Sequence, residues 1–288
     1  MRKDDDMELN ESLENQEAIQ LREQLELPDN VELLDRITEQ SPAREITEST
    51  KELAEGLELD ERTAEGKETQ ELSPFSYSEA YIDRNGKFHP QQITGVYKDS
   101  LRDPGALEVA SELGNWGQQE KQMSCAVRTQ MMIGNEGPGK DYTEAELRQV
   151  AEQFNWYKDQ RGTYYTDIGK VAQLFYGMEY EQHEGLQLDE LAELKQQGAE
   201  LIVAVDHALL ARPYLPKIAT PDHVVELIGF DESDPEHPKV IINDPGRPDG
   251  QGAAYPVEMF KRASYVTNRD TGITGMKSVT ALYRGGRA

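Results

Sequence analysis

The pattern of hydrophobic and polar positions changes at about residue 72. In residues 1–72, leucine and isoleucine recur at helical intervals in "ESLENQEAIQLREQLEL" and in "DNVELLDRITEQ", where Asp29 or Asn30 can cap a helix. The first aromatic residue is Phe75, and residues 1–72 carry 23 acidic against 8 basic side chains. Such a segment buries too little surface to offset its chain entropy. We expect residues 1–72 to form an acidic arm, flexible or helical, and a pro-segment or docking arm that folds on a partner is the alternative.

From Phe75 onward the pattern becomes that of a globular protein. Aromatic-bearing segments flank Asn85-Gly86, which predicts a β-hairpin with its turn there. Segments with apolar residues at helical spacing follow, and each of them ends near a glycine or near aromatic residues. The predicted helices lie within residues 104–117, 123–134, 141–157, 167–178 and 186–198. We expect residues 73–114 to be a linker or extension that packs on a domain formed by residues 115–288.

The spacing then changes from the helical period to that of β-strands. The segments "AELIVAVD", "HVVELIGFD", "KVIINDPG", "SYVTN" and "SVTALYR" predict strands within residues 199–206, 223–231, 239–246, 264–268 and 278–284. Helices precede strands instead of alternating with them. The expected fold class is therefore α+β, with a helical part packed on an antiparallel sheet.

Charge and cysteine content narrow the classes of function. The net charge is −25, which argues against nucleic acid or an anionic membrane as the partner, because both require a basic face. A single cysteine excludes an internal disulfide framework. The first residues, "MRKDDDMELN", lack the apolar stretch of a secretory signal, and runs such as "LIVAV" are too short for a membrane span. We expect a cytoplasmic protein, or one exported into a target cell without a cleavable signal.

That single cysteine, Cys125, lies at the predicted start of a helix, in "MSCAVRTQMMIG", with Ser124 or Met123 at the cap. A thiol attacks as its thiolate, and the unpaired amides of a helix N-terminus favour negative charge there. The position therefore suits a nucleophile. A small buried apolar side chain is the usual role of a lone cysteine, and it remains the alternative.

A cysteine nucleophile needs a base, an orienting group and donors for the oxyanion. His223 opens the strand "HVVELIGFD", and Asp244 follows the next strand in "IINDPG". If those two strands pair in antiparallel fashion, His223 and Asp244 lie side by side. The backbone N–H of the cysteine can bind the oxyanion, together with a side-chain amide from Gln119, or from its rivals Gln118 and Gln122.

The other histidines offer one serious alternative. His207, which follows Asp206 and a predicted strand, is the rival base. We expect His89, His183 and His237 to be solvated loop residues. One cysteine and scattered histidines lack the spacing of a metal site, so we expect neither a metal nor a cofactor.

Taken together, Gln119 six residues before Cys125, His223 on a strand and Asp244 in "NDP" resemble the papain-like cysteine peptidases. Within that fold, the segments "QLDELAELKQQGAELIVAVD", "DHVVELIGFD", "VIINDPG" and "YPVEMFKRA" are most similar to the bacteriocin-processing, double-glycine leader peptidases and their relatives, over residues 115–265. The resemblance implies nucleophile, base, orienting group and oxyanion donor at Cys125, His223, Asp244 and Gln119. Ala126 and Asp222 stand where many relatives have glycine.

The function this implies is a cysteine peptidase acting on a protein or peptide, with small residues, including paired glycines, at the cut site. The same residues can deamidate a glutamine or transfer its acyl group to an amine, and a non-catalytic papain-fold binding module is the alternative of another class. We expect an effector or toxin of bacterial origin, with a cognate immunity protein as a further partner.

Overall fold

A computed structural model of the 288-residue chain describes residues 73–97, 103–136 and 141–285. The acidic arm expected for residues 1–72 lies outside the described residues. Within them the chain forms helices and one large antiparallel sheet, so the expected α+β class is confirmed. None of the helices in these ranges combines the length and the apolar character that a membrane span requires.

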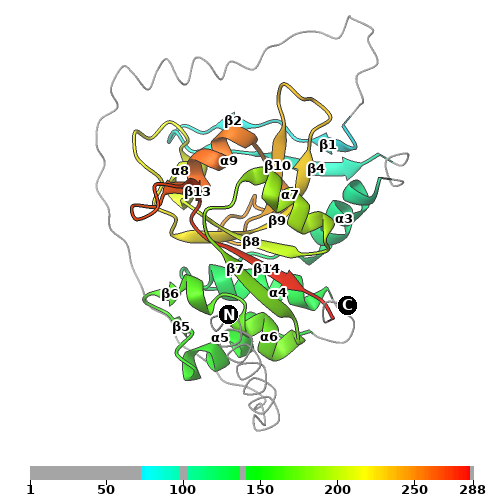
Figure 1. Ribbon diagram of the computed structural model, residues 1–288. Helices are drawn as coiled ribbons and strands as arrows, with labels where there is room; N and C mark the ends of the chain where they lie inside the picture. Colours follow the sequence, from blue (N-terminus) through cyan, green and yellow to red (C-terminus); the bar gives the residue numbers. More distant parts are fainter. Residues whose placement is uncertain (1–72, 98–102, 137–140, 286–288) are drawn as a thin grey trace, which may run out of the picture. The chain divides into compact units, whose positions relative to one another are not determined.

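The main sheet of the described part has eight strands in the order β1-β4-β11-β10-β9-β8-β14-β7 (Figure 1). Every neighbouring pair is antiparallel. The strands are β1 (Phe75–Tyr77), β4 (Gln91–Val96), β7 (Glu179–His183), β8 (Glu200–Val205), β9 (His223–Asp231), β10 (Lys239–Asn243), β11 (Ala253–Pro256) and β14 (Val279–Tyr283). Three small hairpins accompany the sheet: β2 (Tyr81–Ile82) with β3 (Phe88–His89), β5 (Tyr157–Lys158) with β6 (Gly162–Thr163), and β12 (Tyr265–Thr267) with β13 (Thr274–Met276).

Helices cover both faces of this sheet (Figure 1). The described helices are α3 (Pro104–Glu112), α4 (Cys125–Asn135), α5 (Glu144–Gln153), α6 (Lys170–Tyr176), α7 (Leu188–Gln196), α8 (His207–Ala211) and α9 (Val257–Ser264), with short 3-10 turns at Leu113–Asn115 and Tyr165–Asp167. Helices α3 and α4 pack against β9, and α5 and α6 pack against α4. Helices α7 and α9 pack on β8 and its neighbours.

Two hydrophobic clusters explain why the central strands are apolar on both sides. Alternate side chains such as Val203, Val225 and Ile242 are fully buried with Leu191 of α7 and Phe260 of α9. The intervening side chains, among them Ile228, Ile241 and Ala254, pack with Val109 of α3 and Phe75 of β1. Side chains therefore pack against both faces of the central strands, and this packing holds the ends of β9 and β10 in position.

Residues 75–96 contribute strands to the sheet, and residues 104–112 form a helix that covers it. Strand β4 pairs with β11 through Gln91 and Gln92, β1 extends the sheet by pairing with β4, and α3 packs on β9. The β2–β3 hairpin turns at Asn85-Gly86, as predicted, and Gly86 has a φ of 71°, where a glycine is favoured.

The predicted helices and all five predicted strands are present, and several of their ends follow the expected signals. Thr143 caps α5 and forms a capping box with Glu146, while Gly177 ends α6 with a φ of 67°. The sequence pattern does not predict helix α8 or the strands β5, β6, β7, β11 and β13. Strand β7 reads "EYEQH" at the sheet edge, without apolar alternation, and β11 is only four residues long.

Candidate functional site

The candidate nucleophile stands at the tip of a helix. Cys125 is the first residue of α4, and Ser124 is its N-cap, without a side-chain capping bond. The N–H groups of a first helical turn have no partner within the helix, so they favour a negative charge or an oxyanion. The thiol is half-buried. It lines a cavity of about 380 Å3 together with residues 118–123 and with His207, Asp222, His223 and Gly246.

The sheet brings His223 and Asp244 together at this cavity. Strands β9 and β10 are antiparallel neighbours, with Asn243 opposite Glu226, so the first residue of β9 lies near the residue that follows β10. His223 Nε2 is 2.6 Å from Asp244 Oδ1. The histidine is 7% exposed and the aspartate 0%. Because Nε2 is engaged by the carboxylate, Nδ1 is the ring nitrogen available to Cys125.

Electrostatics in the site favour a charged imidazole. Burial lowers the pKa of His223, but the charge of Asp244 and then the Cys125 sulfur outweigh it, so the pKa lies well above its usual value. Burial raises the pKa of Asp244, yet the charge of His223 and the hydrogen bond from it hold the pKa below its ordinary value. An imidazolium paired with a carboxylate is the state that can hold a proton taken from a thiol.

Two hydrogen bonds, one to the carboxylate and one to the backbone carbonyl, hold Asp244 in place. Gly246 N donates to Asp244 Oδ1 at 2.8 Å, and the Trp116 indole donates to the Asp244 carbonyl at 3.0 Å. A Cβ on Gly246 would lie 2.8 Å from His223 Cε1 and 3.2 Å from Asp244 Oδ1. A side chain at this position would therefore collide with the pair, which explains why a glycine suits it.

The structure places the predicted oxyanion donor in the wall of the cavity, with both side-chain N–H groups in use. Gln119 Nε2 donates to the carbonyls of Lys121 and Gln122, each at 2.7 Å, and its Oε1 is buried without a partner. The rivals Gln118 and Gln122 line the same cavity. To reach an oxyanion, the Gln119 amide has to share or exchange one of these two bonds.

The rival base lies in the same cavity. The ring of His207, the first residue of α8, is 5.2 Å from the His223 ring between centroids. The backbone N–H of His207 donates to Asp222 Oδ1 at 3.1 Å, and this bond holds the first residue of α8 at the cavity wall. Burial and the charge of His223 lower the pKa of His207. The lowered pKa favours the neutral form of His207, although the charges of Asp244 and Asp222 act against the shift. Among the described contacts, the His207 ring has no bond to a carboxylate like that of His223.

Tyr165 and Pro221 line a second, larger cavity, and Pro221 directly precedes Asp222 of the first cavity. The Tyr165 hydroxyl donates to the Pro221 carbonyl at 2.5 Å, and both residues line a cavity of about 630 Å3 bordered by residues 266–277. Burial, followed by the charges of Asp222 and Cys125, raises the pKa of Tyr165 to about 12.

The structure corrects two of the expected loop histidines. His183 ends β7 and pairs with Val279, because the polar segment "EYEQH" is an edge strand. His89 belongs to β3, where it bonds Asp249 at 2.6 Å and stacks on Tyr81. The expectation of a solvated loop was wrong for both. His237 is exposed and pairs with Asp234, as expected of a surface residue.

A cluster of carboxylates away from Cys125 has the composition of a cation site. Oxygens of Glu108, Glu112 and Glu200 lie within 4.8 Å of one another. Lys195 Nζ already lies among them, at 2.8, 2.8 and 3.1 Å. The cation of this cluster is a lysine of the chain itself, so these residues do not point to a metal.

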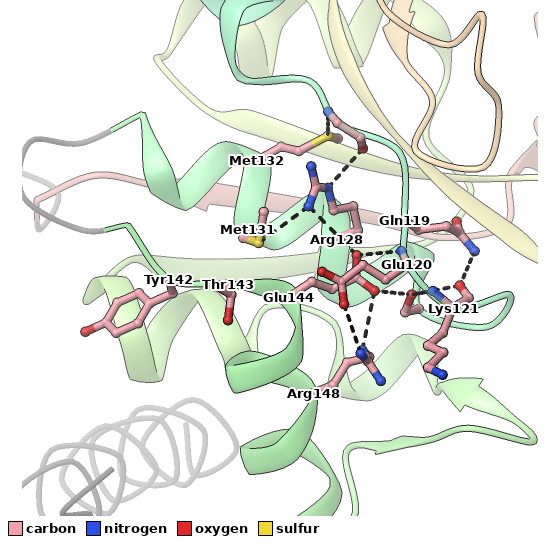
Figure 2. A network of polar contacts seen from close by, with 12 residues as sticks. Gln119, Glu120, Lys121, Arg128, Met131, Met132, Tyr142, Thr143, Glu144 and Arg148 are labelled. Atoms are coloured by element: carbon pink, nitrogen blue, oxygen red, sulfur yellow. Dashed lines mark hydrogen bonds and ion pairs between the residues drawn. The ribbon is translucent and has the colours of Figure 1, made fainter. Parts of the chain in front are cut away.

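Sequence reasoning missed a buried glutamate behind the cavity. Glu144, the first residue of α5, is 1% exposed and accepts hydrogen bonds from Ser124 and from Glu120, on the segment that leads to Cys125 (Figure 2). In the sequence it is one of several acids in the first turn of a helix. No local pattern separates it from a solvated capping residue.

Comparisons with known proteins give a limited result. No protein-family model and no curated protein matches the chain. Among solved structures, one match is a Bacillus anthracis protein described as a C39-like peptidase, with 16% sequence identity and a TM-score of 0.39. The match covers 59% of this chain and 95% of that one.

Proposed function

We propose that the protein is a papain-like cysteine peptidase in which Cys125 is the nucleophile, His223 the general base and Asp244 the residue that orients the imidazole. The observation that carries the proposal is the buried His223–Asp244 pair, 2.6 Å apart, at a cavity that also exposes the thiol of a helix-initiating cysteine. Geometry of this kind activates a thiol without a metal or an organic cofactor.

In the first step, His223 Nδ1 takes the proton of Cys125, and the thiolate adds to the carbonyl carbon of the substrate. The resulting oxyanion accepts the Cys125 backbone N–H, which has no partner within the helix, and the Gln119 amide after exchange of one loop bond. Collapse breaks the C–N bond, and the imidazolium gives its proton to the leaving amine. A thioester on Cys125 remains.

In the second step, His223 takes a proton from water, and the hydroxide adds to the thioester. The C–S bond breaks, the acid product leaves, and the thiolate–imidazolium pair returns. Asp244 stays ionised throughout and stabilises the imidazolium. The acceptor decides the reaction class: with a glutamine side chain as substrate, the same steps release ammonia and leave a glutamate.

The test is incubation of the full chain with a cell lysate, followed by mapping of new protein N-termini, with the Cys125→Ala variant as the control. New termini that require Cys125 support a peptidase and give the residues preferred at the cut site. Conversion of glutamine to glutamate without cleavage supports the deamidase instead. No Cys125-dependent change of either kind contradicts the proposal.

A further inference from the structure

The segment from Gln119 to Ser124 joins the two candidate oxyanion donors, the Gln119 amide and the Cys125 N–H, and it forms a tight turn. Ser124 N donates to the Lys121 carbonyl at 3.2 Å, and the Gln119 amide bonds the carbonyls of Lys121 and Gln122. These contacts lie within the segment. Its backbone also reaches the far wall, because Gln119 N donates to the Pro245 carbonyl at 2.8 Å.

One carboxylate from another helix holds both ends of this segment. Glu144 Oε2 accepts the backbone N–H of Glu120 at 2.9 Å, and Glu144 Oε1 accepts the Ser124 hydroxyl at 2.5 Å. Glu120 follows Gln119, and Ser124 precedes Cys125. Each oxygen of Glu144 therefore bonds a direct neighbour of one of the two residues that would bind the oxyanion.

The carboxylate is itself fixed (Figure 2). Arg148 Nε lies 3.4 Å from Glu144 Oε1, and Arg128, on α4 one turn after Cys125, lies 3.9 Å from Glu144 Oε2. Arg128 also donates to the Gly117 carbonyl at 2.9 Å, and Arg148 to Glu120 Oε2 at 3.1 Å. Burial raises the pKa of Glu144, and the hydrogen bonds from Ser124 and Glu120 and the charge of Arg148 act against that shift. The same bonds and ion pairs hold the carboxylate in position, and removing one member of such a buried group is costly.

We infer that Glu144 is a positioning residue that sets the spacing between the Cys125 N–H and the Gln119 amide, and so preorganises the oxyanion site. The inference rests on the proposed function. Glu144 is not a wall residue of the cavity, so it acts through Glu120 and Ser124 and not by touching the substrate. Donors for an oxyanion act only when they are aligned beforehand, and a misplacement of about 1 Å can cost about 100-fold in rate.

Two chemical probes separate this role from general support of the fold. Iodoacetamide alkylates Cys125 by displacing iodide from a saturated carbon, so no oxyanion forms. p-Nitrophenyl acetate acylates the same sulfur through a tetrahedral oxyanion: the S–C bond forms, the ester C–O bond breaks and p-nitrophenolate leaves. The ratio of the acylation rate to the alkylation rate therefore reports the oxyanion site, whereas a loss of folded protein lowers both rates together.

The variants are Glu144→Gln, which keeps the shape but loses an acceptor, and Ser124→Ala, which removes one of the two Glu144 contacts. Ser124→Ala also removes the bonds of the hydroxyl with the N–H and the carbonyl of Lys121, within the turn. Ser124 makes no side-chain capping bond to α4, so no bond to the helix itself is lost. The matched control is Asp231→Asn. This buried carboxylate accepts the Ser233 hydroxyl at 2.5 Å and its backbone N–H at 3.1 Å, at the opposite end of β9 from His223.

We expect the acylation-to-alkylation ratio to fall about 10- to 100-fold in Glu144→Gln and by less in Ser124→Ala. It should stay at the wild-type value in Asp231→Asn, even if that variant melts earlier. Unchanged ratios in both site variants would overturn the inference, and if Glu144→Gln does not fold, an unchanged ratio in Ser124→Ala overturns it alone. A wild-type protein that is not acylated at Cys125 would instead overturn the proposed function, and the inference with it.

Discussion

Asp244→Asn removes one charge from the buried pair and keeps nearly the same shape. The asparagine Oδ1 can still accept the bonds that His223 Nε2 and Gly246 N now give to the carboxylate. What changes is the pKa of His223, because the charge of Asp244 is the largest of the influences that raise it. An opposite charge at such a distance typically shifts a pKa by about 1 to 3 units, or about 1.4 kcal/mol per unit.

At a fixed pH near neutrality, this loss reduces the population of the thiolate–imidazolium pair about 10- to 1000-fold. The assay is the second-order rate of alkylation of Cys125 by iodoacetamide, followed by mass spectrometry between about pH 5 and pH 10. We expect the variant to react that much more slowly near pH 6, and to approach the wild type at alkaline pH, where the thiol ionises without help. Asp222→Asn, a charge change in the same cavity without a bond to the His223 ring, is the control and should have a much smaller effect.

The same substitution has a defined effect on stability. The folded-state pKa of His223 is raised, so the contribution of His223 to folding stability is lost as the pH rises through that pKa. The folded-state pKa of Asp244 is lowered, so the contribution of Asp244 to folding stability is lost as the pH falls through the pKa of Asp244. The difference in melting temperature between wild type and Asp244→Asn should be largest between those two pKa values.

Equal alkylation rates of Cys125 in wild type and in Asp244→Asn near pH 6 would refute the reasoning, because the carboxylate would then have no influence on the thiol.

Three further predictions concern neighbouring residues. Gly246→Ala should slow alkylation of Cys125 and destabilise the fold by about 1–3 kcal/mol, because the added methyl group meets the His223 ring. Gly114→Ala, where a Cβ meets nothing within 4 Å, is the control and should have neither effect. Equal behaviour of the two variants would contradict the geometry. Burial raises the pKa of Glu226, so the folded state loses stability as the pH rises above the ordinary carboxyl range. The Glu226→Gln variant should therefore melt at a higher temperature than wild type at about pH 8, with little difference at about pH 5. An equal gain in melting temperature at both pH values would contradict this role of Glu226. His207→Ala should leave alkylation near pH 6 within a fewfold of wild type, and a loss as large as that of His223→Ala would identify His207 as the base.

The juxtaposition of His223 and Asp244 could be predicted because it depends on local information. Their two strands follow one another in the sequence, and antiparallel neighbours bring the start of one beside the end of the next. The helix that begins at Cys125 could be predicted from its apolar spacing. The occupied amide of Gln119 could not, because its two acceptors are carbonyls of a turn whose shape the sequence does not reveal.

Glu144 and His207 were beyond the reach of the sequence for a related reason. The bonds of Glu144 reach from α5 to residues 20 and 24 positions earlier, and they exist only once α4 and α5 are packed. His207 was placed after a strand but not on a helix, since five residues give too short a period to recognise. The edge strand β7 carries polar side chains and has no strand-like pattern of apolar residues. Its strand structure depends on pairing with β14, which the sequence of β7 alone does not reveal.

The most direct test of the central claim is the rate at which iodoacetamide alkylates Cys125 at about pH 6, in wild type and in His223→Ala, relative to a small model thiol. The account predicts that wild-type Cys125 reacts much faster than the model thiol, and that His223→Ala loses this advantage while its melting curve stays cooperative. A wild-type cysteine that reacts no faster than the model thiol, or one whose rate is the same without His223, would contradict it.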